Sequence, residues 1–408
     1  MPVSPDLLLP LRPLDLLAIL LLGWQLPATA LLLARLLPGI ARKPALTPRS
    51  STLTNLGQVS VVVPTLNEAQ RLPSCLAGLS RQGYEVREIL VVDSNSQDGT
   101  PDLVKAAAQR DPRYHLLMDD PLPAGWVGRP WALHTGFLHS HEESEWVLGI
   151  DADTQPQPGL VASLLQIAET EQWDLISLSP KFILKSFGEW WLQPSLLLTL
   201  IYRFGARGDR PVCPERLLAN GQCLLIRRSL LVKMGGYSSA RQSFCDDVTL
   251  VRRAAALGAK VAFLDGGQLL QVRMYEGMAE TWREWGRSLD LKDATPVAQL
   301  WGDLGFLLAV QGLPLPMSLC LGLAGLSSLS IQLAWGLNLC LVGIRLGMLA
   351  AIAGSYDWQK ATGRRGFWLS PCSDPLAVLR ILLSSLQTPK QWRGRTYSTI
   401  GSPVSSSQ

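Results

Sequence analysis

The chain has 408 residues, enough for one large domain with additional segments. Its 37 basic and 33 acidic residues leave a net charge of only +4, so the chain lacks the large positive charge that is typical of a nucleic-acid-binding protein. The seven cysteines include no Cys-x-x-Cys pair, which argues against a disulfide framework or a zinc site and favours a reducing compartment. Apolar residues make up 47% of the chain, and leucine-rich blocks crowd both of its ends.

The amino-terminal block, residues 14–37, is nearly all leucine and alanine and is long enough for one membrane-spanning helix. A secretory signal peptide is the alternative, because residues 28–30 resemble a cleavage site, but the apolar stretch continues past them as that of an anchor would. Residues 44–57 are rich in Pro, Ser and Thr and predict a linker. By the positive-inside rule, four basic residues place the middle of the chain in the cytoplasm: Arg35, Arg42, Lys43 and Arg49.

The middle of the chain alternates strand-like and helix-like segments. An apolar run at residues 59–64 leads through a polar loop into an expected helix at 71–81, and a second run at 88–92 leads into an expected helix at 102–110. Residues 217–226 predict a further strand. Such units predict a parallel sheet with polar loops along one edge, where a nucleotide can bind. Neither G-x-G-x-x-G nor the P-loop motif follows these strands.

The sequence DADT, residues 151–154, follows a short apolar run at 146–150 that predicts a buried strand. Asp151 and Asp153 therefore lie at the carboxyl end of a strand. Two carboxylates at this spacing can share a hard divalent cation, Mg²⁺ or Mn²⁺, that faces phosphate oxygens. Plain turn chemistry is the alternative, because Asp is common where a strand ends.

Two other segments carry charged residues where a helix is expected to begin. Arg129 ends a glycine-punctuated loop, residues 123–129, and a cation there can contact a diphosphate; a solvated arginine in a Gly/Pro turn is the alternative. Asp246 and Asp247 begin an expected helix within residues 244–258. Acids at that position also serve as helix caps, so capping and chemistry both remain open.

The carboxyl-terminal part predicts a return to the membrane. Residues 304–353 hold a single charge, Arg345, and are long enough for two membrane helices joined near residues 325–328. Residues 376–386 are too short to cross and are expected to lie in the membrane interface. The Ser-rich end of the chain is expected to be disordered.

Two segments of the middle region are also expected to approach the membrane. Residues 190–204 carry no charge before Arg203 and predict an interfacial or buried helix. From residue 275 onward apolar residues repeat at helical spacing and include Trp282 and Trp285. This repeat of apolar residues is explained equally by a helix packed in the core and by a helix that lies in the membrane interface.

Four motifs occur in one order: VVVPTLNEA, VVDSNSQDGT, DADT and CDDVTLVRR. Together they resemble the signature of the family 2 glycosyltransferases with the GT-A fold, over residues 59–291. The AGWVGRPWA loop, the RMY segment at Arg273 and the WRGRTY ending are further similar to membrane enzymes that glycosylate isoprenoid lipids. Among these are the carotenoid glycosyltransferases, including cyanobacterial enzymes for myxol-type xanthophylls, and hopanoid-associated relatives.

The resemblance implies an α/β fold of GT-A type, with a Rossmann-like, mostly parallel sheet, helices on both faces, and membrane helices at both ends. The implied domains are residues 1–57 as anchor and linker, 58–295 as the catalytic domain, and 296–408 as membrane helices, interfacial helix and disordered tail. The protein is then an integral membrane protein with a cytoplasmic catalytic domain, in the plasma or thylakoid membrane if it is cyanobacterial.

The resemblance also implies a role for each matching residue. Asp247 would be the general base, Asp153 would ligate Mg²⁺ or Mn²⁺, and Asp151 would bind the ribose or the metal. Arg129 occupies a position where many relatives have lysine. Its planar guanidinium group therefore replaces the compact point charge of an ammonium group. The rest of the donor site would comprise Pro64, Thr65, Asn67, Glu68, Asp93 and Asn95, with Asp93 holding the base. The acceptor side would comprise Asp246, Gln222, Arg273, Trp282 and Trp285.

The implied reaction is the inverting transfer of a sugar from a nucleotide-sugar donor to a hydroxyl of a membrane lipid or isoprenoid, with a carotenoid as the first choice. The Q-x-x-R-W motif of processive synthases is absent, which favours one sugar per acceptor. A polyprenyl or hopanoid acceptor, a nucleotidyltransferase and a non-catalytic sugar-nucleotide sensor are the alternatives.

Overall fold

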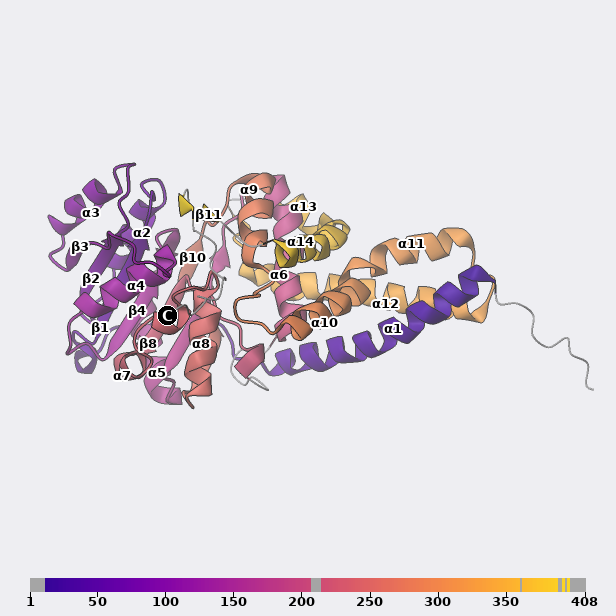
Figure 1. Cartoon of the computed structure of the whole chain (residues 1–408), viewed down its shortest axis with the longest axis horizontal. Helices are drawn as coiled ribbons and strands as arrows, with labels where there is room; N and C mark the ends of the chain where they lie inside the picture. Colours follow the sequence, from indigo (N-terminus) through magenta and orange to yellow (C-terminus); the bar gives the residue numbers. More distant parts are fainter. Residues whose placement is uncertain (1–11, 207–213, 360–361, 388–390, 393–394, 397–408) are drawn as a thin grey trace, which may run out of the picture.

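The computed structural model of the chain describes residues 12–206, 214–359, 362–387, 391–392 and 395–396. An α/β part occupies one end of the molecule and a helical part extends away from it (Figure 1). The disorder expected for the Ser-rich end concerns residues that lie outside this described part of the chain.

A seven-stranded sheet forms the centre of the α/β part, in the order β3-β2-β1-β4-β8-β6-β9. Neighbouring strands are parallel, except that β8 is antiparallel to both β4 and β6. The mostly parallel sheet is therefore confirmed. Its strands are β1 (Val59–Thr65), β2 (Val86–Asp93), β3 (Tyr114–Met118), β4 (Trp146–Ile150), β6 (Leu175–Ser179), β8 (Cys223–Arg227) and β9 (Val261–Asp265).

Helices cover both faces of this sheet, which is why its strands read as unbroken apolar runs. In β1, Val61 and Val63 belong to one core, and Val62 belongs to a second core on the opposite face. Gly136 lets a helix approach β1 closely, since a Cβ there would lie 2.3 Å from a Val62 methyl group. The first core includes α2 (Leu72–Ser80), α3 (Thr100–Ala108) and α5 (Leu160–Glu171); the second includes α4 (Gly128–His139), α7 (Arg228–Lys233) and α8 (Asp246–Ala256).

A second, three-stranded sheet links the α/β part to the helical part. Its order is β5 (Thr154–Pro156), β10 (Leu270–Val272) and β7 (Lys181–Phe182), with β10 antiparallel to β5 and parallel to β7. Because β5 follows directly on the two aspartates of the DADT sequence, this sheet connects those acids to the segments that lead into the helices.

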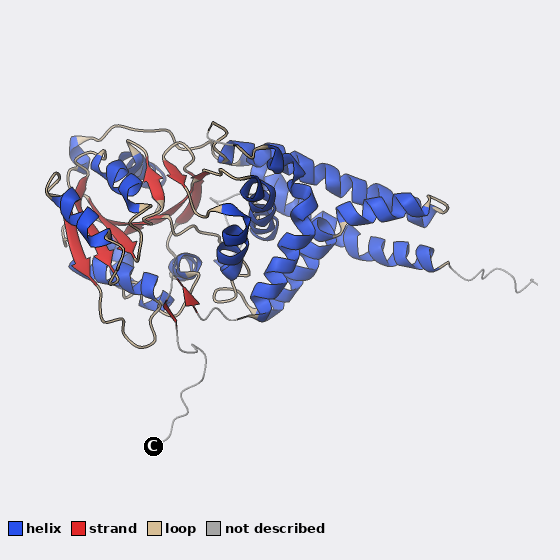
Figure 2. Ribbon diagram, turned by 90° about the horizontal axis from the view of Figure 1, so that it is seen from above, coloured by secondary structure: helices blue, strands red, loops and turns tan. Residues whose placement is uncertain are grey.

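The helical part, drawn as the blue helices away from the red strands in Figure 2, has its own core, to which α6 (Phe187–Phe204) contributes. Trp190 and Leu196 on this helix are fully buried, so the buried alternative expected for the segment is correct. Ser186 and Glu189 form a capping box that starts α6. The other helices are α1 (Pro13–Leu36), α9 (Gly277–Glu284), α10 (Val297–Leu307), α11 (Pro314–Ala324), α12 (Leu329–Ile352), α13 (Arg365–Leu369) and α14 (Asp374–Leu386).

Two helical segments are long and apolar enough to cross a membrane, Pro13–Ala41 and Leu329–Ser355. The break expected near residues 325–328 is present. The span expected before it is a pair of helices, Val297–Gly312 and Pro314–Ala324, that meet at a bend of 50° and add a third candidate if they are taken as one span. The bend lies where Pro314 begins α11, and proline cannot continue the hydrogen bonding of the preceding turn.

The strand expected over residues 217–226 is wrong in its first half, since β8 begins only at Cys223. Asn220 and Gln222 form a local turn instead. The Gln222 N–H donates to Asn220 Oδ1 and the Asn220 amide donates to Gln222 Oε1, both at 3.0 Å. Side chains of Asn that bond to the backbone two residues on favour turns over strands.

Candidate active site

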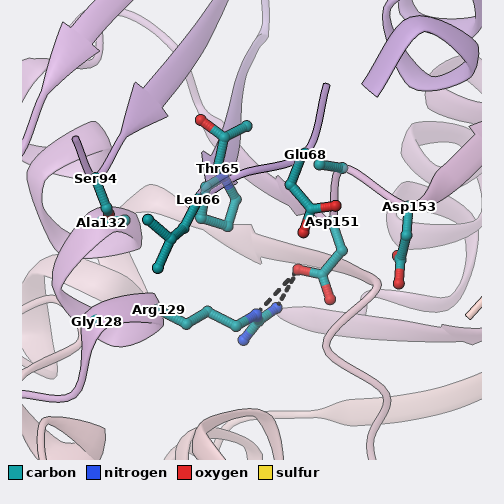
Figure 3. Close-up of a pocket in the computed structure, with 11 residues that line it drawn as sticks. Thr65, Leu66, Glu68, Ser94, Gly128, Arg129, Ala132, Asp151 and Asp153 are labelled. Atoms are coloured by element: carbon teal, nitrogen blue, oxygen red, sulfur yellow. Dashed lines mark hydrogen bonds and ion pairs between the residues drawn. The ribbon is translucent and has the colours of Figure 1, made fainter. Parts of the chain in front are cut away.

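A pocket opens at the carboxyl ends of β1 and β4, beside the start of α4 (Figure 3). Its empty volume is about 470 Å³, which includes some open solvent at its mouth. Open α/β sheets bind their ligands at this edge. The pocket is lined by Pro64, Thr65, Leu66, Glu68, Ser94, Gly128, Arg129, Ala132, Asp151, Ala152 and Asp153. Six of these are among the residues predicted for the donor and the metal.

The three remaining predicted donor residues hold the loops around the pocket and do not line it. Both oxygens of the buried Asp93 carboxylate accept hydrogen bonds from Ser96, from its N–H at 2.8 Å and its hydroxyl at 2.6 Å. The Asn67 N–H in turn donates to the Ser96 hydroxyl at 2.8 Å. Asn67 and Asn95 have φ of 55° and 65°, a left-handed conformation that Asn adopts more easily than most residues. Contact of Asp93 with a nucleobase stays a prediction.

Arg129 connects the two acidic motifs of the site. From the first turn of α4 its Nε and Nη2 atoms reach Asp151 Oδ1 at 2.9 and 2.8 Å (Figure 3). Its Nη1 pairs with Asp246 at the start of α8, and Nη2 also donates to the carbonyl oxygen of Gly221 at 2.7 Å. The guanidinium therefore ties DADT to the Asp246-Asp247 pair, which lies far away in the sequence.

Asp247 is oriented by backbone groups. The Gly221 N–H donates to Asp247 Oδ2 at 2.7 Å, and the Val248 N–H donates to Oδ1 at 2.9 Å. The peptide units on the two sides of Gly221 therefore contact both Arg129 and Asp247. Our sequence reasoning gave Gly221 no role; the Asn-Gly-Gln turn was the only signal that pointed to it.

Burial and mutual repulsion control the charges in this group. Burial lowers the pKa of Arg129, but the carboxylates of Asp151, Asp246 and Asp247 raise it by more, so this guanidinium stays charged. Burial raises the pKa of Asp246 and of Asp247 above the usual value, although Arg129 opposes that shift. A second cation in the pocket would favour the ionised form of these acids.

Asp153 fits a metal ligand. Its side chain lies at the edge of the pocket, and its Oδ1 atom is buried without a hydrogen-bond partner among the described residues (Figure 3). Burial, and then the charge of Asp151, raise its pKa well above the usual value. The described residues contain no group of three or more His, Cys, Asp or Glu side chains that could hold an ion. Oxygens of the bound donor would therefore have to complete the coordination.

The predicted acceptor-side residues are spread between the pocket and the helical part. The backbone carbonyl of Gln222 accepts the Asp151 N–H at 3.2 Å, which places this buried residue at the site. Arg273 instead pairs with the buried Glu189, at 2.6 and 3.1 Å. Trp282 and Trp285 are half-buried against the core of the helical part, and Trp285 lies 6.1 Å from the Phe182 ring. Their contact with an acceptor stays a prediction.

The mixed sheet, the helices on both faces and the acidic pocket at the strand ends are the features of a GT-A type fold. Residues 60–235 match the family model described as Glycosyl transferase family 2. This match covers less than half of the chain. Among solved structures, the mannosyltransferase PcManGT from Pyrobaculum calidifontis, in complex with GDP-Man and Mn²⁺, has the same fold, with a TM-score of 0.52 and 18% identity over 91% of this chain and 99% of that one.

Two curated relatives are enzymes of lipid-related metabolism by name. A 4,4'-diaponeurosporenoate glycosyltransferase of Staphylococcus haemolyticus is 24% identical over 236 residues, which are 57% of this chain and 60% of that protein. An undecaprenyl-phosphate mannosyltransferase of Micrococcus luteus is 32% identical over 117 residues, 28% of this chain and 45% of that protein. The chain spans between 45% and 60% of the length of the first curated relatives that it matches.

Proposed function

We propose that the protein transfers a single sugar from a nucleotide-sugar donor to a hydroxyl group of an isoprenoid lipid in the membrane, with a carotenoid alcohol as the first candidate acceptor. The observation that carries the proposal is the Arg129 bridge. It ties Asp151, which lines the pocket at the sheet edge, to Asp246, the neighbour of Asp247, although neither Asp246 nor Asp247 lines that pocket itself.

Asp247 is the proposed general base. Its carboxylate accepts hydrogen bonds from two backbone N–H groups, which fix its orientation. Each carboxylate oxygen keeps a lone pair that can take a proton. The acceptor hydroxyl attacks the anomeric carbon, Asp247 takes the hydroxyl proton, and the nucleoside diphosphate leaves from the opposite face of the sugar. Proton removal of this kind raises the reaction rate about 10²- to 10⁴-fold. An α-linked donor then gives a β-glycoside.

The donor diphosphate is placed between Arg129 and the DADT acids in this proposal. Arg129 offers a planar set of donors for phosphate oxygens. Asp153, with Asp151 beside it, would hold the divalent cation. A bound Mg²⁺ or Mn²⁺ neutralises charge on the leaving diphosphate.

The membrane parts of the chain support a lipid acceptor. Candidate spans lie at both ends of the chain, and both relatives described above are named for isoprenoid compounds. We propose a cytoplasmic catalytic domain, because basic residues follow the first span. The similarity to the Micrococcus relative supports a polyprenyl phosphate as the second candidate acceptor.

The test compares the full-length protein with its Asp247→Asn variant in lipid nanodiscs, with a carotenoid alcohol, a radiolabelled nucleotide sugar and Mn²⁺. Asp247→Asn should abolish glycoside formation and leave binding of the nucleotide sugar unchanged. Asp111→Asn is the matched control, because this acid lies between α3 and β3 and pairs with Arg113 outside the pocket. Transfer by Asp247→Asn near the wild-type rate would refute the role of the base. Release of pyrophosphate in place of nucleoside diphosphate would show a nucleotidyltransferase.

A further inference from the structure

A second concentration of charge lies where α1 and α6 reach the α/β part. Four arginines from separate segments meet there, and we call them the arginine cluster: Arg35 in the last turn of α1, Arg203 in the last turn of α6, Arg216, and Arg252 on α8. The guanidinium groups of Arg203 and Arg252 both stack on the ring of Phe204, at 4.8 and 5.6 Å from its centroid. The four side chains thus form one continuous group.

Asp303 on α10 is the only carboxylate of the described residues within ion-pair distance of the cluster. It lies 2.8 Å from Arg216, 3.4 Å from Arg203 and 3.6 Å from Arg35, and only 3% of its side chain is exposed. Other N–H groups of the cluster donate to backbone carbonyls, such as those of residues 202, 203, 289 and 290. Carbonyl groups satisfy hydrogen bonds but bring no net charge. The carboxylates of Asp290 and Glu215 act on Arg203 and Arg252 from beyond ion-pair distance, so Asp303 is the one carboxylate of the described residues that pairs directly with these cations.

Arg252 is buried without an ion-pair partner in the described part of the chain. The residue is 9% exposed, and its Nη2 atom has no hydrogen-bond partner within the described part of the chain. Burial, and then the charges of Arg203 and Arg216, lower its pKa to about 10. Glu215 offsets that shift only in part, from beyond ion-pair distance. Buried charges are normally paired, so four cations that share one ion-paired acid among the described residues are expected to attract a further anion.

The position of the cluster indicates the source of that anion. Arg35 lies near the end of the candidate span Pro13–Ala41, and Asp303 lies on the first helix of the bent pair. The cluster therefore lies at the end of a candidate span, and α1 and α10, which carry Arg35 and Asp303, both extend from the α/β part into the helical part (Figure 1). Arg35 and Arg216 remain accessible, with 14% and 28% of their side chains exposed. Guanidinium groups bind phosphate oxygens through paired N–H donors.

We propose that the arginine cluster binds the phosphate group of an anionic membrane lipid, with Arg35 and Arg216 as the contacting residues. The lipid is a bound ligand that fixes the α/β part against the bilayer and does not take part in sugar transfer. The proposal depends on the membrane placement of α1, and it is independent of the reaction at Asp247.

The test titrates phosphatidylglycerol into the full-length protein in a neutral detergent, with phosphatidylcholine as the reference lipid. Binding is measured by intact-complex mass spectrometry and by the thermal midpoint, without any sugar donor. One basic residue near a membrane surface contributes about 1 kcal/mol, so Arg216→Gln should weaken phosphatidylglycerol binding about fivefold. Arg49→Gln, an exposed arginine of the linker, removes the same charge outside the cluster and should change little.

Asp303→Asn makes the test sharper because its expected effect has the opposite sign. It removes the acid that competes with the phosphate, so binding should become about fivefold tighter. Equal stabilisation by both lipids, or equal effects of Arg216→Gln and Arg49→Gln, would overturn the proposal. The same stabilisation by inorganic phosphate would overturn the lipid as its source. If Asp303→Asn cannot be purified, the comparison of the two arginine variants decides.

Discussion

Replacing Gly221 by alanine is expected to disable the active site while leaving the protein folded. A Cβ at this position would lie 2.7 Å from Arg129 Nη2, 3.0 Å from its Cζ and 3.1 Å from its Nη1. The obstructed atoms are the far end of a flexible side chain, so the guanidinium can move and the backbone need not. This movement would disturb the contacts of the Arg129 guanidinium with the carboxylates of Asp151 and Asp246.

The size of the effect follows from these contacts. Ordinary contacts of a Cβ begin near 3.4 Å, so the guanidinium must withdraw by about 0.7 Å. Its Nη2 atom now lies 2.8 Å from Asp151 and 2.7 Å from the Gly221 carbonyl, and bonds of that length weaken steeply on such a displacement. A misplacement of about 1 Å at a reacting group costs about 100-fold in rate. The free energy of unfolding should fall by only about 1 kcal/mol, the net contribution of one hydrogen bond.

The assay measures initial rates of sugar transfer in nanodiscs at varied donor concentration, together with the thermal midpoint. Gly221→Ala should lower kcat about 100-fold and leave the midpoint nearly unchanged. Gly149→Ala is the matched control, because a Cβ on this β4 glycine would meet Leu133 Cδ2 at 3.4 Å, the Tyr237 hydroxyl at 3.8 Å and the Leu224 carbonyl oxygen at 3.9 Å, all ordinary contact distances. A wild-type kcat for Gly221→Ala would show that the position of Arg129 does not matter for the reaction.

Three further outcomes are expected. Asp153→Asn should weaken binding of Mn²⁺ in the presence of a nucleotide sugar at least tenfold, and an unchanged Mn²⁺ titration curve would exclude Asp153 as a ligand. Burial raises the pKa of Glu189, but hydrogen bonds from Arg273 and from two backbone N–H groups bring it down to about 2. Its stabilising contribution is therefore complete above about pH 4.5 and lost as the pH falls towards 2, so Glu189→Gln should lower the thermal midpoint at pH 7 and flatten its decline in acid. Trp282→Ser with Trp285→Ser should slow transfer to the lipid acceptor and spare donor hydrolysis; an equal loss of both would indicate simple packing.

The elements that position the site could be predicted because their signals are local. The run of residues 146–150 is a buried strand with the same bounds in the structure, since a strand covered on both faces needs an uninterrupted apolar run. The acids that follow it necessarily fall at the edge of the sheet. The mostly parallel topology followed from the repeated strand-loop-helix units in the same way.

The contacts within the site could not be predicted, because they join residues that are distant in the chain. Arg129 and Asp246 are separated by 117 positions, and their pairing depends on α4 and α8 both beginning at one edge of the sheet. The turn that places Gly221 beside Arg129 was not predicted, because the apolar residues around it indicated a strand over residues 217–226. Interaction of Asn220 with Gln222 outweighed that strand propensity.

Arg273 and Glu189 explain how the helical part is held in register with the acids of the pocket. The Arg273 N–H donates to the carbonyl oxygen of Asp153 at 3.4 Å, while its guanidinium pairs with Glu189 in the first turn of α6. Glu189 also accepts the Gly277 N–H at 2.6 Å, at the start of α9, the helix that carries Trp282. One buried carboxylate therefore connects the DADT loop, α6 and α9. Through these contacts Arg273 holds the DADT loop at a fixed position relative to α6 and α9.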